Sequence, residues 1–111
     1  MPAADDAVAG AVFSALADPT RRHVVRALAA QPRVTASALA ADLPISRQAV
    51  AKHLAALRDA GLAVAEPVGR ETHYRLTPAP LSDAMRWIAT AGGEWDERLG
   101  RLERRLAEDD R

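Results

Sequence analysis

The sequence contains no cysteine, and this absence removes several classes of function. A chain without thiols forms no disulfide, binds no metal through thiolates and carries no cysteine nucleophile or thiol redox sensor. Lysine is almost absent too, since Lys52 is the only one and arginine supplies every other cationic side chain. Aromatic residues are few, with one Phe, one Tyr and two Trp, so the core must be built from Leu, Val and Ala.

Long apolar runs are also missing. No stretch approaches the ~20 apolar residues of a membrane span, and no basic segment leads into an apolar run at the N-terminus. We therefore predict a cytoplasmic protein with no membrane partner. At 111 residues the chain predicts one domain, residues 1–111, whose modest core favours oligomerisation.

The net charge of zero conceals a segregation of charge along the chain. Residues 19–75 hold nine basic and four acidic side chains, a local charge of +5, whereas residues 1–18 carry −3 and residues 76–111 carry −2. A polyanion interacts with local charge, so the basic middle favours nucleic-acid binding.

Capping residues predict where helices begin. Asp5 or Asp6 can cap a first helix over 5–17, and Asp18 followed by Pro19 begins a second. Val34 can pair as a very short strand. Two further helices follow, at 36–42 and 47–60, capped by Thr35 and Ser46 and closed by a glycine at 61.

Two β-type runs, 62–68 and 72–76, flank a tip at 69–71, and a last helix is expected over 81–107. The predicted fold is mainly α: about five helices, a small β-hairpin wing and a long C-terminal dimerisation helix. This is a winged helix-turn-helix, with the helix-turn-helix at 36–60 and the wing at 62–76.

The helix at 47–60 has two distinct sides. Val50, Leu54 and Leu57 form its apolar stripe, and polar side chains project from the opposite side. Arg can pair with guanine and Gln with adenine in the major groove. Exposed polar residues on an amphipathic helix are the alternative interpretation. The predicted DNA-binding residues are Ser37, Ser46, Arg47, Gln48, Ala51, Lys52, His53 and Arg70.

Several of these residues admit two roles. Arg70 fits a narrow minor groove, or it is a solvated turn arginine. His53 is interpreted as a half-buried packing residue or a phosphate contact in preference to a metal ligand or base reader. Capping explains Ser46 without DNA. The roles of four further residues stay open: Arg21, Arg22, His23 and His73.

The last helix carries an apolar heptad seam with spacings of 4, 3, 4, 3, 4, 3 and 4. Its members are Leu81, Met85, Ile88, Gly92, Trp95, Leu99, Leu102 and Leu106. Because the phase continues across Gly92, we expect one long helix, with a bend at the glycines as an option. Packing on the first helix is one use of the seam. We favour a homodimer interface along this seam.

Three segments resemble the ArsR family of bacterial winged-helix repressors: FSALADPTRRHVVRAL (13–28), LPISRQAVAKHLAALRDAGL (43–62) and GRETHYRL (69–76). The pattern from Trp87 to Leu102 resembles a non-metal-sensing branch. The resemblance implies a homodimeric repressor with the first and last helices at the interface, so the predicted dimer contact includes Val8 and Val12. It also implies base-contacting positions at Arg47, Gln48, Ala51 and Lys52. Many members have serine at the position of Ala51, so one polar contact is missing here.

Metal-responsive members of that family use a cysteine motif on the recognition helix or His/Asp/Glu clusters on the last helix. This chain has no cysteine, and residues 81–111 contain no histidine. We therefore predict no metal site, no cofactor and no thiol sensing, and the sequence identifies no effector.

The resulting prediction is a homodimeric repressor that binds double-stranded DNA at an inverted repeat, with half-sites in successive major grooves ~34 Å apart. Control of its own operon is a further option. The alternative is a winged-helix module that binds protein and not DNA. An enzyme is not expected, because no catalytic triad, glycine-rich phosphate loop or buried carboxylate pair is apparent.

Overall fold

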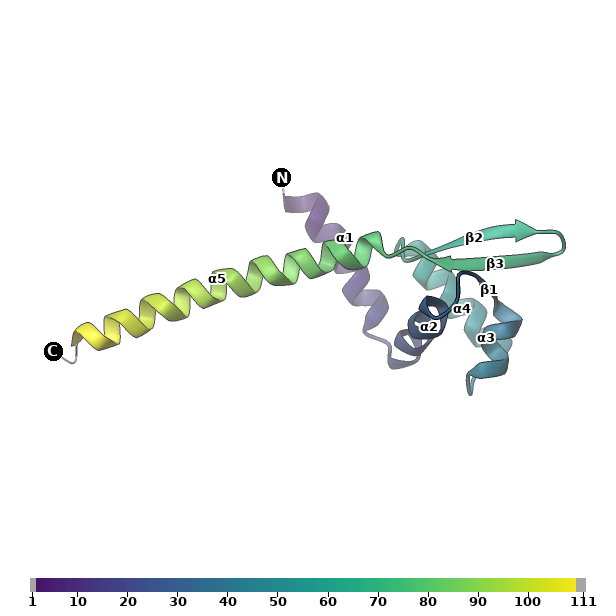
Figure 1. Ribbon diagram of the computed structural model, residues 1–111, viewed down its shortest axis with the longest axis horizontal. Helices are drawn as coiled ribbons and strands as arrows, with labels where there is room; N and C mark the ends of the chain where they lie inside the picture. The colour runs from purple at the N-terminus through teal and green to yellow at the C-terminus, as the bar shows by residue number, and fades with distance from the viewer. Residues whose placement is uncertain (1, 110–111) are drawn as a thin grey trace.

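The computed structural model describes residues 2–109, and the side chains of residues 6–109. The fold has five helices and a small three-stranded antiparallel sheet. Four of the helices and the sheet form a body, and the C-terminal helix projects from it (Figure 1). The principal extents are 74 × 32 × 20 Å, because the wing and the C-terminal helix extend in opposite directions. The elements are α1 (Pro2–Leu16), α2 (Pro19–Ala29), β1 (Val34–Thr35), α3 (Ala36–Asp42), α4 (Arg47–Asp59), β2 (Ala63–Val68), β3 (Glu71–Leu76) and α5 (Ala79–Asp109).

Side-chain caps start three of the helices as predicted. Asp18 Oδ1 accepts from the backbone N–H of Arg21, and the hydroxyls of Thr35 and Ser46 accept from the N–H three residues on, each at 3.1 Å. Gly61, just past α4, has φ +78°, the left-handed conformation expected of a residue that ends a helix.

The start of the first helix was predicted wrongly. Helix α1 begins at Pro2, so Asp6 lies inside it and is not a cap. Its carboxylate instead accepts a hydrogen bond from Trp87 Nε1 at 2.7 Å, which joins α1 to α5. The side chain of Asp5, the other predicted cap, lies outside the described side chains.

The wing is a β2–β3 hairpin, with β1 added on the free side of β3, giving the strand order β1-β3-β2. The register pairs Ala65 with Tyr74 and Val68 with Glu71, so the tip is only Gly69-Arg70. Strand β3 thus begins one residue earlier than predicted. Gly69 has φ +63°, a conformation that a two-residue hairpin turn requires and glycine adopts without strain.

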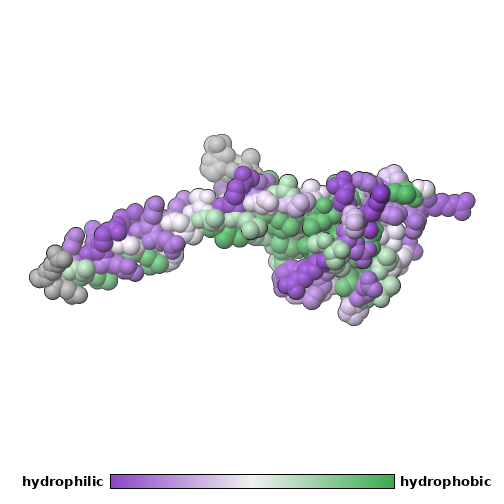
Figure 2. Space-filling view, viewed as in Figure 1, coloured by the Kyte–Doolittle hydropathy of each residue, from purple (hydrophilic) through white to green (hydrophobic). Residues whose placement is uncertain are grey.

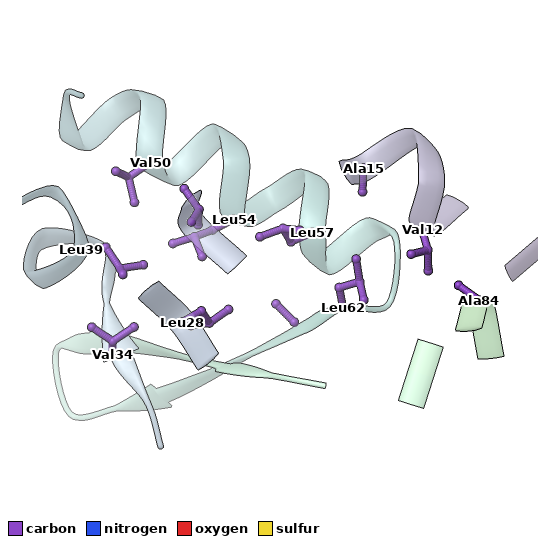
Figure 3. Packing of buried hydrophobic residues seen from close by; sticks show 12 residues of the cluster. Val12, Ala15, Leu28, Val34, Leu39, Val50, Leu54, Leu57, Leu62 and Ala84 are labelled. Atoms are coloured by element: carbon purple, nitrogen blue, oxygen red, sulfur yellow. The ribbon is translucent and has the colours of Figure 1, made fainter. Parts of the chain in front are cut away.

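The core lies where α4 packs across α2, α3 and the base of the wing (Figure 3). Leu54, Leu57 and Leu28 are fully buried there. Val12, which was expected at a dimer interface, is 1% exposed and belongs to this core, so it has no free surface to offer a second copy. Val8 is half-buried.

Helix α5 is continuous through Gly92 and Gly93, as the unbroken seam predicted. Only its first part packs on the body: Ala84 is buried, and the Trp87 ring meets Phe13 edge-on at 5.7 Å between centroids. Farther along, apolar side chains stay exposed along one edge of the helix (Figure 2), including Trp95 at 59% and Leu106 at 56%. Among residues 2–109, no helix is long and apolar enough to cross a membrane.

Truncating the α4 stripe tests whether this core sustains the fold. We expect Leu54→Ala to lower the free energy of unfolding by about 2–5 kcal/mol, because the cavity cannot fully collapse. Chemical denaturation at fixed protein concentration measures this. Val68→Ala, at an exposed position near the wing tip, should change stability by less than about 0.5 kcal/mol. Equal effects of the two substitutions would contradict the observed core.

The cap of α4 predicts a smaller effect. Ser46→Ala should destabilise the protein by about 1 kcal/mol, because the N–H of Ala49 loses its acceptor. Ser46→Asp restores an acceptor and should recover most of that loss in the same denaturation experiment. If both variants unfolded like the parent chain, the cap would contribute nothing measurable.

Candidate nucleic-acid interface

Burial of one side of α4 determines which side chains face away from the body. Val50, Leu54 and Leu57 are 0% exposed. The predicted base-contacting positions lie on the other side of the helix and are all exposed: Arg47, Gln48, Ala51 and Lys52. The start of α4 therefore presents two cationic side chains and one amide at the positive end of the helix dipole, where anions are favoured.

A groove of about 270 Å³ lies beside these positions, between the starts of α3 and α4 and the wing. Ser37, Arg47, Ala51 and Arg70, which lie in three separate segments of the sequence, all line it. Gln48 and Lys52 are exposed on α4 but are not among the lining residues. Four of the predicted DNA-binding residues thus line the groove, and Gln48 and Lys52 lie on the adjoining face of α4.

Two strand residues that complete the groove were not among the predicted site residues. Thr72 and Tyr74 line it with their hydroxyl-bearing side chains. Both lie on the side of β3 that also carries Leu76, whose side chain packs against the core. The period-two alternation of β3 could have placed them on the inner side of the wing. Their proximity to α3 and α4 required the tertiary structure.

Each acidic side chain of the wing strands lies beside a basic side chain. Glu66 Oε1 accepts from Arg75 Nη2 at 3.0 Å across the two strands, and Glu71 Oε1 lies 3.6 Å from His73 Nε2. By contrast, no carboxylate among residues 6–109 forms an ion pair with Arg47, Lys52 or Arg70. These three cations therefore face solvent without a described counter-charge.

His53 is a packing residue that links elements, one of the two roles predicted for it. Its Nδ1 accepts from Arg21 Nε at 3.4 Å, which links α4 to the start of α2. Arg21 Nη1 also donates to the carbonyl of Ala15, and Arg22 donates to the carbonyl of Leu16. The two arginines, whose roles were open, thus close the end of α1 and tie it to α4.

The acid that caps α2 belongs to the same cluster. The backbone N–H of Arg21 is the largest cause that lowers the pKa of the Asp18 carboxyl, and the nearby His53 and Arg21 side chains act in the same direction. His23 is exposed on α2 and lines neither the groove nor this cluster. Both ring nitrogens of His73 are buried without a hydrogen-bond partner among the described residues.

Candidate metal ligands do not cluster in the part of the chain whose side chains are described. Within residues 6–109, no three His, Asp or Glu side chains are arranged to hold a metal ion. The chemistry available at the interface is therefore that of guanidinium, ammonium, amide and hydroxyl donors. Such groups bind phosphate oxygens and base edges.

Comparisons with known proteins agree with this geometry. A family described as "Helix-turn-helix domain" matches residues 16–65. The chain is 44% identical over 70 residues to the HTH-type transcriptional regulator Rv2034 of Mycobacterium tuberculosis, covering 63% of this chain and 64% of that protein, slightly under two thirds. It is 32% identical over 96 residues to the arsenical resistance operon repressor of Escherichia coli, covering 86% of this chain and 82% of the repressor.

A solved structure agrees over most of the chain. The ArsR-like transcriptional regulator from Rhodococcus sp. RHA1 superimposes with a TM-score of 0.81 at 43% identity, covering 88% of this chain and 92% of that one. Both sequence and architecture therefore lead to one conclusion: this chain belongs to the ArsR family of winged helix-turn-helix transcriptional regulators.

Proposed function

We propose that this chain is a sequence-specific DNA-binding repressor that acts as a homodimer on an inverted-repeat operator. The observation that carries the proposal is the exposed face at the start of α4, where Arg47, Gln48 and Lys52 adjoin a groove closed by Arg70. No chemical step is needed, because a dimer bound over a promoter excludes the transcription machinery. Control of the protein's own operon is one instance of this activity.

Helix α4 enters the major groove by its first turn. Arg47 can donate two hydrogen bonds to guanine O6 and N7, and Gln48 can pair with adenine N6 and N7. Ala51 has no long side chain and lets the helix approach the base edges. Lys52, one residue farther along, reaches a phosphate or a guanine, and Ser37 and Ser46 donate to phosphates.

The wing follows the DNA backbone beside the recognition helix. Arg70 lies at the hairpin tip, exposed and without a described carboxylate partner. A guanidinium at such a tip suits the enhanced negative potential of a narrow minor groove. Arg75 forms an ion pair with Glu66 across the two strands and is not part of the proposed contact set.

A homodimer would bury the apolar side chains that α5 exposes in a single subunit. On the side that α1 leaves uncovered, its seam exposes Ile88 at 53%, Leu102 at 51% and Leu106 at 56%. A contiguous apolar stripe of this length on a lone subunit is unfavourable in water and marks an interface. Val8 and the exposed seam residues form the proposed dimer contact.

Sensing through metal or thiol chemistry is not part of the proposal. The sequence has no cysteine, and α5 has no histidine. A gel shift with DNA from the chain's own upstream region separates the repressor from a winged-helix module that binds only protein. If every duplex tested migrated as free DNA even in low salt, the result would favour the protein-binding module.

Phosphate contacts predict a change in salt dependence. Lys52→Ala and Arg70→Ala should each weaken operator binding and flatten the slope of log affinity against log salt by about one unit, because each releases about one counterion fewer. Fluorescence anisotropy across a salt series measures the slope. Arg58→Ala, at the exposed far end of α4, is the matched control and should leave the slope unchanged.

Base readout predicts a change in selectivity. Arg47→Ala should relax the preference at one base pair per half-site by about 1–3 kcal/mol, because a bidentate guanine contact is lost. Competition between operator variants measures this. The preference at all other positions should persist, and Arg58→Ala should leave every preference intact. Unchanged selectivity in Arg47→Ala would remove Arg47 from base readout.

A further inference from the structure

A cavity of about 470 Å³ lies where α1 crosses the first half of α5, and it shares no lining residue with the groove beside α4. Asp6 lines it from α1, and residues between Asp83 and Glu94 line it from α5. Pockets that hold small molecules usually enclose about 300–1,000 Å³. The cavity is therefore large enough for a small organic ligand, and the proposed DNA contacts make no use of it.

One wall of the cavity is the indole ring of Trp87, which two contacts to α1 hold in place. Its Nε1 donates to the Asp6 carboxylate at 2.7 Å, and the ring meets Phe13 edge-on at 5.7 Å between centroids. Trp87 nevertheless remains 41% exposed. The ring thus offers a ligand a fixed apolar surface whose π face carries partial negative charge.

The charged side chains of the cavity are three carboxylates and one guanidinium: Asp6, Asp83, Glu94 and Arg86. Arg86 donates to Asp83, three residues earlier on α5, and so compensates one carboxylate. Within residues 6–109, neither Asp6 nor Glu94 forms an ion pair. The cavity therefore combines an aromatic wall with an excess of negative charge.

We propose that this cavity binds a small organic cation, an amine or a quaternary ammonium carried on an apolar body. The cationic centre would lie over the Trp87 ring, whose quadrupole attracts it. The carboxylates of Asp6 and Glu94 would balance its charge, and its apolar body would cover Ala91, which also lines the cavity. This site is separate from the DNA-binding surface and does not depend on the repressor function.

The side chains present favour an organic cation over a metal ion. Within residues 6–109, no three His, Asp or Glu side chains are arranged to hold a metal. A hard cation such as Ca²⁺ takes about six to eight oxygen ligands, whereas a quaternary ammonium needs an aromatic face and a nearby negative charge. An anionic ligand would meet repulsion from the carboxylates.

The cavity lies on the side of α5 that the apolar seam leaves free. At about 100° per residue, positions nine apart in an α-helix lie on opposite sides of it. Thr90, which lines the cavity, is nine residues from the seam residue Leu99, and Asp83 has the same relation to Gly92. The proposed homodimer covers the seam and so leaves the cavity open.

Nuclear magnetic resonance of the indole N–H groups tests the site in the unmodified chain, because Trp87 and Trp95 are its two tryptophans. Benzyltrimethylammonium, an aromatic quaternary cation, is the probe, and benzyl alcohol and benzenesulfonate are its neutral and anionic counterparts. The Trp87 signal should shift and saturate at millimolar cation or below. The Trp95 signal, which the variant Trp95→Phe identifies, should stay in place. The neutral and anionic probes should bind about fivefold more weakly or worse.

Matched substitutions test the charge and the ring separately. Glu94→Gln, at an exposed position, should weaken cation binding about two- to fivefold. Glu103→Gln, the same change at an exposed position of α5 outside the cavity, is the control and should bind like the parent chain. Trp87→Leu should weaken binding about tenfold, and Trp87→Phe, which keeps a ring, should bind better than Trp87→Leu. Circular dichroism checks that each variant is folded, and if Trp87→Leu unfolds, the comparison of Glu94→Gln with Glu103→Gln decides.

Several results would overturn the proposal. These are equal shifts of the two indole signals, equal binding of benzyl alcohol and the cation, equal affinities of Glu94→Gln and Glu103→Gln, or an unmoved Trp87 signal at millimolar cation. None of these measurements contains DNA, so such a failure leaves the repressor standing. A chain that binds the cation as described but no operator would instead remove the repressor and keep the cavity.

Discussion

The packing of one side of α4 against the rest of the body is the interaction on which the structure depends. Val50, Leu54 and Leu57 are fully buried, and they join α2, α3 and the base of the wing in one core. Because a helix is rigid, burying three residues of this stripe also determines where the opposite side points. The exposure of Arg47 and Lys52 is a mechanical consequence of that packing, with no other element needed to hold them outward.

The body and α5 differ in how completely each covers its own apolar surface. The body buries its leucines within one chain, whereas α5 exposes most of its seam beyond the contact with α1. The bond between Trp87 Nε1 and Asp6, with the Trp87–Phe13 contact, holds the two parts together at one crossing. Arg21 in turn links the end of α1 to His53 on α4.

Much of this fold was predictable because its signals are local. Caps, the glycine after α4, and the apolar periodicities of α2, α4 and α5 each depend on residues within one or two turns. Predictions failed where a distant residue intervened. Asp5 or Asp6 was expected to cap α1, but α1 begins at Pro2, and the Asp6 carboxylate accepts a hydrogen bond from Trp87, more than eighty positions away. Val12 was expected at a dimer surface from the family resemblance, and it is buried within the subunit instead.

The sequence by itself determined the winged helix-turn-helix, the exposed cationic start of α4 and the unbroken seam of α5, because each follows from periodicity and capping along one segment. Only the tertiary structure decided that Arg70 and Thr72 share a groove with Arg47, and that His53 accepts a hydrogen bond from Arg21. Those relations depend on the angle at which the wing and α2 meet α4. That angle is set by how whole faces of side chains interlock, which no single stretch of sequence records.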